Sequence, residues 1–338
     1  MCQETAAPFS LATGPLIRVY VFKMDAELHR FVVLTHHLIS DGWSLGVMMD
    51  ELAKFYSAGC AGEQLTLAPP LQYREFVQRQ VARANSVRVL QHEAYWMAQF
   101  PNGIPMAPLP SDQCPSGTGT KRGARYSTRI DAELCQSLKQ FGQAHGATLF
   151  MTLLSAFGIW LHRVTHKKEL VIGTATAARF SIEDTSVVGY CTHLLPICCR
   201  VDGNPSLSDY LTTLRKTILA AYEHQDYPFA RLIARLSPST RPDDIPLTTI
   251  LNLDQSRPSP RMSRLKVEFL PVPAAFALVD LRLDVSEIEG ELWLDYDYRS
   301  EHFTSDTIFR WHQQFHAILL AMTADPNVAP GLPVMVSH

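Results

Sequence analysis

The sequence predicts an α/β fold of mixed strands and helices arranged in two lobes. Short apolar runs of strand length alternate with longer amphipathic stretches along most of the chain. At 338 residues, the chain exceeds the length at which a single hydrophobic core usually keeps growing. Residues 101–123 are rich in proline, glycine and serine, as connections between lobes often are. We therefore expect an N-terminal lobe (residues 1–110), a linker (111–123) and a C-terminal lobe (124–338).

The N-terminal lobe is predicted to begin with two strands and a helix. Residues 16–24 and 30–35 have the composition of neighbouring strands joined by a short polar link. The second run is almost continuously apolar, which predicts a strand buried on both faces. Apolar residues then recur at helical spacing up to Gly59, and either Asp41 or Ser44 can cap the start of this helix.

The rest of the chain is predicted to alternate helices with strands. The expected helices cover residues 71–100, 131–146, 148–166 and 206–223, a short segment that starts near Pro228, and the stretch from Thr304 to Met322. The expected strands cover residues 170–177, 187–201, 248–253, 265–272, 278–288 and 291–298. Glu289 and Gly290 are typical of the turn in a hairpin between the last two strands.

Composition excludes several classes of partner. The formal net charge is −3 and no run of lysine or arginine stands out, so we expect neither nucleic acid nor a membrane as a partner. No apolar segment reaches transmembrane length, and the N-terminus lacks the pattern of a signal peptide. The seven cysteines are scattered, without a Cys-x-x-Cys pair, which favours reduced thiols in the cytoplasm.

The segment most informative about chemistry is His36-His37-Leu38-Ile39-Ser40-Asp41-Gly42-Trp43-Ser44, at the junction between the second strand and its helix. The positive end of a helix dipole disfavours an extra proton on a nearby imidazole, which stays neutral and can accept one. Consecutive strand residues point to opposite faces, so we expect His36 and His37 to have different roles. The junction therefore predicts an acyl-transfer site.

This segment resembles the His-His-x-x-x-Asp-Gly motif of the condensation domains of nonribosomal peptide synthetases, which belong to the chloramphenicol acetyltransferase-like superfamily. Four further segments resemble the family in order and spacing: Gly14-Pro15-Leu16-Ile17-Arg18, the stretch from Val188 to Pro196, His224-Gln225-Asp226-Tyr227-Pro228-Phe229, and Ile250-Leu251-Asn252-Leu253. The resemblance implies two similar lobes that form a V with a central tunnel.

The resemblance also implies a reaction, in which an amine attacks a thioester to form an amide. His37 would accept the proton of the nucleophile or hold the ammonium and the tetrahedral intermediate. Gly42 would leave room for a backbone N–H to approach the oxyanion, and Asp41 would shape the loop by pairing with an arginine. The remaining residues implied are His36, Trp43 and Ser44 as structural members of the motif, and Tyr190, His193 and Asn252 along the substrate channel.

Both substrates would arrive on phosphopantetheine arms of upstream and downstream carrier proteins, so the domain itself is expected to hold no cofactor. Two departures from the family pattern affect these expectations. His193 stands where many relatives carry an asparagine, which would alter the acyl group accepted. Only residues 1–35 precede the histidine pair, so we expect a truncated first lobe and an Asp41 without its arginine.

Other functions fit the residues less well. Metal binding by His36, His37 and Asp41 is disfavoured because the two histidines point apart and no further ligand cluster lies nearby. The segment differs from the Asp-Gly-Val-Ser-Trp of epimerisation domains, the aspartates of heterocyclisation domains and the Asp-Phe-Gly-Trp-Gly of plant acyltransferases. Two alternatives stay open: a non-catalytic fragment that binds carrier proteins, and an ester-forming acyltransferase of the same superfamily.

Overall fold

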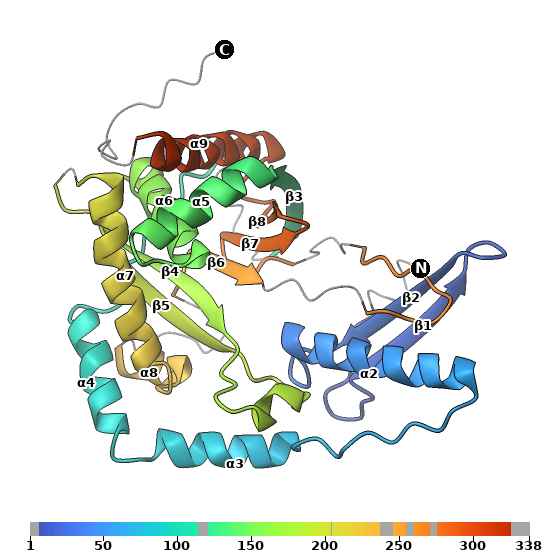
Figure 1. The fold of residues 1–338 in the computed structure, drawn as a ribbon. Helices are drawn as coiled ribbons and strands as arrows, with labels where there is room; N and C mark the ends of the chain where they lie inside the picture. The colour runs from blue at the N-terminus through green and yellow to red at the C-terminus, as the bar shows by residue number, and fades with distance from the viewer. Residues whose placement is uncertain are drawn as a thin grey trace. The chain divides into compact units, whose positions relative to one another are not determined.

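The computed structural model describes residues 7–113, 121–203, 205–236, 246–254, 260–270 and 276–325. Its contacts divide the chain into two compact units (Figure 1). Unit 1 comprises Met1–Ala82, Ala177–Thr192 and Arg257–Phe269, and unit 2 comprises Arg83–Thr176, His193–Ser256 and Leu270–His338. Each unit is therefore assembled from segments that are distant in sequence.

Unit 1 contains a hairpin and the helix that follows it. Strands β1 (Ile17–Lys23) and β2 (His29–Thr35) pair antiparallel, as the sequence predicts. Helix α2 (Gly42–Ala61) follows, and its left-handed cap residue Gly62 has φ 71°. The expected burial of β2 on both faces is wrong: its first three side chains are exposed and the next four are half-buried. In the described residues this sheet has two strands, and within the apolar run Phe31 is exposed while residues 32–34 are half-buried.

Unit 2 is built on a six-stranded mixed sheet with the order β3-β8-β7-β6-β4-β5. Its strands are β3 (Gly123–Ile130), β4 (Glu169–Thr176), β5 (His193–Arg200), β6 (Thr249–Asp254), β7 (Leu281–Ile288) and β8 (Glu291–Arg299). β4–β6 and β6–β7 are parallel pairs, and the other neighbours are antiparallel. Glu289 (φ 53°) and Gly290 (φ 88°) make the expected hairpin turn between β7 and β8.

Helices cover the sheet of unit 2 and enclose its core (Figure 1). They are α4 (Val89–Gln99), α5 (Ala132–Ala144), α6 (Leu149–Thr165), α7 (Leu207–Glu223), α8 (Phe229–Leu236) and α9 (Ser305–Ala324). α6 is buried from Met151 to Leu161. In the described part of the chain no single helix is long and apolar enough to cross a membrane. Only α5 and α6 taken together, across a 98° bend, pass that test by length and composition.

Several predicted elements are corrected by the structure. The helix expected over residues 71–100 breaks into α3 (Tyr73–Ala84) and α4, because Asn85 and Ser86 favour a turn. The strand expected from residue 187 begins only at His193. Of the strand expected at 265–272, residues 265–270 form no strand beyond an isolated Met262–Leu265 bridge, and 271–272 lie outside the described residues.

The division into units differs from the expected lobe boundaries. Residues 83–110, expected in the first lobe, belong to unit 2, whereas residues 177–192 and 257–269 belong to unit 1. Residues 114–120 of the expected linker lie outside the described residues, and its final residue opens β3. Ser111 and Asp112 before that gap are bound to His302 and Thr304, so the described start of the linker is anchored within unit 2.

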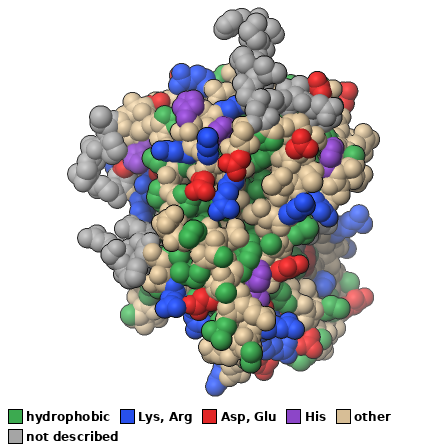
Figure 2. All heavy atoms as spheres, turned by 90° about the vertical axis from the view of Figure 1, so that its left-hand side faces the viewer, with side chains coloured by type: hydrophobic (Ala, Val, Ile, Leu, Met, Phe, Trp, Pro, Cys, Tyr) green, Lys and Arg blue, Asp and Glu red, His purple; other side chains and the backbone are tan. Residues whose placement is uncertain are grey.

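The distribution of charge agrees with the small net charge of the chain. The face drawn in Figure 2 mixes lysine and arginine side chains with aspartate and glutamate, and apolar side chains lie between them.

Candidate active site

The histidine loop connects the end of β2 to the start of α2 within unit 1. The backbone N–H of His36 donates to Leu16 O (2.9 Å), and that of Ile39 donates to His36 O (3.0 Å), so the chain turns sharply after the strand. The hydroxyl of Ser40 donates to the hydroxyl of Thr35 across the turn. These bonds close the loop on itself and place Asp41 at the N-cap of α2.

The imidazole of His37 is held in one tautomer. Its Nδ1 atom lies 2.7 Å from the carbonyl oxygen of Ser40. A carbonyl can only accept a hydrogen bond, so Nδ1 carries a proton, and in the neutral ring Nε2 has the lone pair. The side chain is exposed, so Nε2 is accessible as a base.

His36 makes different contacts. Its Nδ1 accepts a hydrogen bond from the backbone N–H of Leu38 (3.1 Å), so in the neutral ring the proton is on Nε2. Its half-buried ring meets Phe9 edge-on, with centroids 6.0 Å apart. In their neutral forms the two adjacent histidines therefore have opposite tautomers, and their surroundings differ. Both lie beyond the end of β2 at Thr35, so the difference comes from the turn and not from the alternation of a strand.

Asp41 is the most heavily bonded side chain of the loop. Its Oδ1 accepts hydrogen bonds from the N–H of Ser44 (2.8 Å) and the hydroxyl of Ser44 (2.7 Å), which cap α2. The guanidinium of Arg179 donates to both carboxylate oxygens, at 2.9 and 3.0 Å. The N–H of Cys191 (3.1 Å) and the hydroxyl of Thr192 (3.3 Å) complete the shell around Oδ2.

The Asp41–Arg179 pair corrects the expectation that Asp41 lacks an arginine. Both side chains are 2 % exposed. Burial alone would raise the pKa of Asp41, but the hydrogen bonds from Arg179 and Ser44, together with the charge of Arg179, hold it below its ordinary value. The resemblance implies a family arginine in a segment before the histidines that this sequence does not contain, whereas the structure supplies an arginine 138 residues further along the chain.

That segment, residues 177–192 between β4 and β5, is called the insertion segment below. Trp43 Nε1 donates to Thr185 O (2.8 Å), and the guanidinium carbon of Arg179 lies 5.5 Å from the centroid of the Trp43 ring. The Ser44 hydroxyl accepts a bond from the N–H of Gly189 (3.0 Å). Trp43 and Ser44 therefore join the start of α2 to the insertion segment.

Gly42 opens the first turn of α2 and is exposed. A Cβ added there would meet no atom within 4 Å, so the space beside its backbone is open. The N–H groups of a first helical turn have no acceptor within the helix. Both observations fit the expected approach of a backbone N–H to an oxyanion.

Of the expected channel residues, Tyr190 lies beside His37. The two rings meet edge-on, with centroids 4.9 Å apart and an interplanar angle of 81°. Tyr190 is 43 % exposed and belongs, like His37, to unit 1. The structure therefore brings together His37, Tyr190 and the Asp41 network in one unit.

Comparison with known proteins identifies the family. The family model described as "Condensation domain" matches residues 1–337. This chain belongs to the condensation domain family. A linear gramicidin synthase from Brevibacillus parabrevis is 32% identical over 340 residues, which cover 99% of this chain and 4% of that protein. Chondramide synthase from Chondromyces crocatus is 32% identical over 327 residues, 96% of this chain and 8% of that protein.

Solved structures confirm the fold of the condensation domain. The X-domain from teicoplanin biosynthesis aligns with a TM-score of 0.86 at 19% identity, over 97% of this chain and 76% of that one. The condensation domain of the monacolin K polyketide synthase aligns with a TM-score of 0.84 at 18% identity, over 97% of this chain and 77% of that one. The chain thus spans a small fraction of the length of its curated relatives and about three quarters of these two structures.

The other two expected channel residues of the condensation domain lie in unit 2. His193 begins β5, and its Nδ1 donates to Gln225 O (3.1 Å). Burial lowers the pKa of His193, although the bond to Gln225 opposes this effect. The amide of Asn252 on β6 accepts from the N–H of Ala175 (2.9 Å) and donates to Asp284 (2.8 Å). Asn252 therefore links β4, β6 and β7, a structural use that its place in the sequence does not reveal.

Sequence reasoning also missed Arg179 and Tyr73. The only local signal for Arg179 was a charged residue just beyond the apolar strand β4. Tyr73, the first residue of α3, donates its hydroxyl to Tyr190 O (3.0 Å). Both depend on contacts between distant segments, which periodicity does not reveal.

Metal ligation was the main rival interpretation of this loop. Across the described ranges, no group of three or more histidine, cysteine, aspartate or glutamate side chains is arranged to hold a metal ion. The carboxylate of Asp41 is instead occupied by Arg179.

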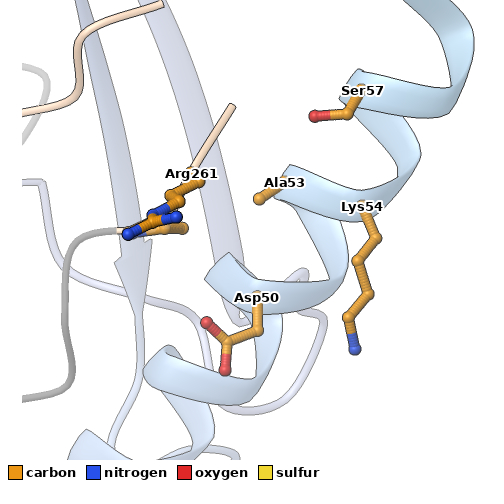
Figure 3. A pocket seen from close by; sticks show the side chains of 6 residues that line it. Asp50, Ala53, Lys54, Ser57 and Arg261 are labelled. Carbon is orange, nitrogen blue, oxygen red and sulfur yellow. The ribbon is translucent and has the colours of Figure 1, made fainter. Parts of the chain in front are cut away.

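A pocket of about 350 Å³ lies on another part of α2 (Figure 3). Its lining residues are Asp50, Ala53, Lys54, Ser57, Pro260 and Arg261. The N–H of Ser263 donates to Ser57 (3.0 Å), which ties this later segment to the helix. Asp50 follows the Asp41 cap by nine residues, roughly 13 Å along the helix axis. The pocket is therefore distinct from the histidine loop.

Proposed function

We propose that this condensation domain forms an amide bond between a donor acyl or peptidyl thioester and an acceptor aminoacyl thioester. The observation that carries the proposal is the imidazole of His37, whose Nδ1–H is bound to Ser40 O and whose Nε2 is left as an accessible base. The family assignment supports the same reaction, because the curated relatives include linear gramicidin synthase and tyrocidine synthase 3.

In the proposed step, the acceptor nitrogen attacks the thioester carbonyl carbon, and a tetrahedral intermediate forms. Nε2 of His37 takes a proton from that nitrogen or holds the ammonium in place. The C–S bond then breaks, and the sulfur leaves with the proton as a thiol. General base catalysis of this kind contributes about 10²–10⁴-fold to a rate. The N–H of Gly42 is the proposed donor to the developing oxyanion.

The acyl group needs no covalent attachment to the domain. Cys191, whose N–H binds Asp41, is 2% exposed, and burial raises the pKa of its thiol to about 11. A neutral, buried thiol is a poor nucleophile. Asp41 is committed to Arg179, and we assign it to the shape of the loop rather than to proton transfer.

The proposed partners are an upstream and a downstream carrier protein, each presenting its substrate on a phosphopantetheine arm. We place the reaction in the cytoplasm, on the basis of the scattered cysteines of the sequence. His193 and Asn252 stay proposed as channel residues of unit 2, and His36 as a structural neighbour of the reacting histidine.

The test is His37→Ala, assayed with a donor-loaded and an acceptor-loaded carrier by intact mass spectrometry. We expect the rate of product formation to fall by about 10²–10⁴-fold with an unchanged circular dichroism spectrum. The matched control is His29→Ala, an exposed histidine at the start of β2, which should keep the parent rate. Turnover by His37→Ala near the parent rate would refute the catalytic assignment.

The same assay separates the two alternatives. A non-catalytic carrier-binding module would retain both carriers in a pull-down and release no product from the parent. An ester-forming enzyme would transfer the donor to a hydroxyl acceptor and leave the amine acceptor unchanged.

A further inference from the structure

The contact between Tyr190 and His37 depends on how the insertion segment is held. Three successive residues of this segment are bonded through their backbones. Gly189 N–H donates to the Ser44 hydroxyl (3.0 Å), Tyr190 O accepts from the Tyr73 hydroxyl (3.0 Å), and Cys191 N–H donates to Asp41 (3.1 Å). Bonds before, at and after Tyr190 fix the direction in which its side chain leaves the backbone.

Tyr73 holds this stretch by shape as well as by its hydroxyl. A Cβ built on Gly189 would lie 2.1 Å from Cδ2 of the Tyr73 ring, so the ring lies directly against the glycine backbone. Tyr73 itself stacks on Phe76, with centroids 6.1 Å apart, and Phe76 packs with Val187 and Cys191 in a small core. The start of α3 therefore clamps the insertion segment at the residue before Tyr190.

Arg79, further along α3, holds the same segment by charge. Its guanidinium lies 2.8 Å from the carboxylate of Glu183 and 3.7 Å from that of Asp184. These contacts link α3 to the insertion segment at a second, more exposed point, in addition to the bonds around Tyr190.

We propose that Tyr190 and Tyr73 are positioning residues for His37. The bond from Nδ1 to Ser40 O anchors one atom of the imidazole, and the edge-on Tyr190 ring restricts rotation of the rest. Together they aim Nε2 and keep a single tautomer. The proposal rests on the proposed function of His37 and extends it to two residues outside the histidine motif. A misplacement of about 1 Å in such a group can cost roughly 10²-fold in rate.

The test compares Tyr190→Leu with Tyr190→Phe and Tyr73→Phe. The leucine variant loses the ring, the phenylalanine variant keeps it, and Tyr73→Phe loses only the bond to Tyr190 O. The control is Ile182→Ala, at a 90% exposed position of the same segment. Two readouts are needed: kcat and KM with both carrier-bound substrates, and ¹⁵N spectra of labelled histidine, in which His37→Gln identifies the His37 signals.

We expect Tyr190→Leu to lower kcat by roughly 10–100-fold with little change in KM, and to shift the His37 ¹⁵N signals from one tautomer toward a mixture. Ile182→Ala should resemble the parent in both readouts. Tyr190→Phe, which keeps the ring, should lose less than Tyr190→Leu, and Tyr73→Phe should lie between Tyr190→Leu and the parent. A raised KM with unchanged His37 signals would make Tyr190 a substrate-channel residue and overturn the proposal. Unchanged kcat and signals would overturn it as well. The spectra need no substrate, so they test the clamp even if the parent forms no amide.

Discussion

At the scale of single residues, the site separates the group that reacts from the groups that hold it. His37 is exposed, and its Nδ1 is bonded to Ser40 O while Nε2 is accessible. Asp41 is buried, and both of its carboxylate oxygens accept hydrogen bonds from neighbours within unit 1. An exposed imidazole can meet substrate, whereas the guanidinium of Arg179 lowers the pKa of the buried Asp41 carboxyl and keeps it ionised. The two motif residues therefore differ in role because they differ in burial and partners.

Asp41→Asn tests the structural role of the carboxylate. The substitution leaves Arg179 buried without its counter-charge, so we expect a loss of about 3–5 kcal/mol at pH 7, measured by urea unfolding. The pKa of Asp41 is lower in the folded state than its ordinary 3.8. Its contribution is therefore full above pH 3.8 and disappears as the pH falls through the lower folded value.

The gap in stability between parent and Asp41→Asn should accordingly narrow below pH 3.8. Glu27→Gln, at an exposed position in the turn between β1 and β2, serves as a control and should change stability little at either pH. Unfolding curves of parent and Asp41→Asn that coincide at pH 7 would show that the carboxylate does not stabilise the loop.

His312 on α9 gives stability a second dependence on pH, which comes from a buried base and not from a buried acid. Burial first, and the neighbouring His316 second, lower the pKa of His312 to about 4 from its ordinary 6.5. Its Nδ1 lies 3.1 Å from the hydroxyl of Tyr296. In the unfolded chain His312 takes up a proton near pH 6.5, whereas in the folded protein it does so only near pH 4. The free energy of unfolding therefore falls as the pH drops from 6.5 toward 4.

His312→Gln should remove this part of the acid sensitivity. The difference between the ordinary His312 pKa of 6.5 and its folded value of about 4 corresponds to about 3 kcal/mol. Between pH 7 and pH 4, the free energy of unfolding of the parent should therefore fall by that much more than that of the variant. Thermal or urea unfolding at the two pH values measures the difference. Parallel losses in parent and variant would assign the acid sensitivity to other groups.

At the scale of elements, the sequence predicts best what is determined locally. The helices that begin after Thr148, Ser206 and Thr304 start where a side chain of each cap accepts a bond from the third residue beyond it. The turn at Glu289 and Gly290 is equally local. Caps and turns involve neighbours in the chain, so their signals can be recognised in a single sequence.

Elements determined by distant partners could not be predicted in the same way. β3 was missed because it directly follows the expected linker, yet Arg125 faces Asp297 on β8 and forms an ion pair at 2.6 Å. Residues 187–192 have the composition of a strand, but Gly189 and Cys191 bond to the start of α2 instead. Arg179 belongs to the same class, since its role depends on a fold that brings it to Asp41.

Asp112 tests one such distant contact at the start of α9. Its carboxylate accepts bonds from the N–H of Thr304 (2.9 Å) and the hydroxyl of Thr307 (2.9 Å). We expect Asp112→Ala to cost about 1 kcal/mol, as the loss of a cap does. Asp306→Ala is the matched control, because it removes one negative charge from the same helix terminus without these two bonds. If both variants lose the same free energy of unfolding, the contribution of Asp112 comes from its charge and not from its two hydrogen bonds.

At the scale of the whole molecule, the chain passes between its two units at residues 82/83, 176/177, 192/193, 256/257 and 269/270. At 82/83, 176/177, 192/193 and 269/270 the sequence offers no clear shift in composition. The expected single linker reflected the longest stretch rich in proline, glycine and serine, although residues 237–246 and 255–264 are also rich in proline and serine. The histidine loop and the insertion segment that carries Arg179 are thus distant in the sequence and meet only in the folded unit 1.

The two units also differ in how their strands are buried, which leads to the last prediction. β7 lies between β6 and β8, and Leu283 at its centre is 0% exposed, whereas Val21 on the two-stranded hairpin of unit 1 is 65% exposed. Leu283→Ala should cost about 2–5 kcal/mol in urea unfolding, because it leaves a cavity in a close-packed core. Val21→Ala should stay within about 1 kcal/mol of the parent.

Amide hydrogen exchange in the parent gives an independent measurement of the same difference. β7 is paired with a strand on each side, so its backbone amides are bonded within a buried sheet. We therefore expect these amides to exchange only when the protein unfolds globally. The amides of β1 and β2 have one partner strand each among the described residues and should exchange earlier. Equal protection of β2 and β7 would mean that the hairpin is covered in solution, and its apolar residues would then be core residues, as their sequence alone predicts.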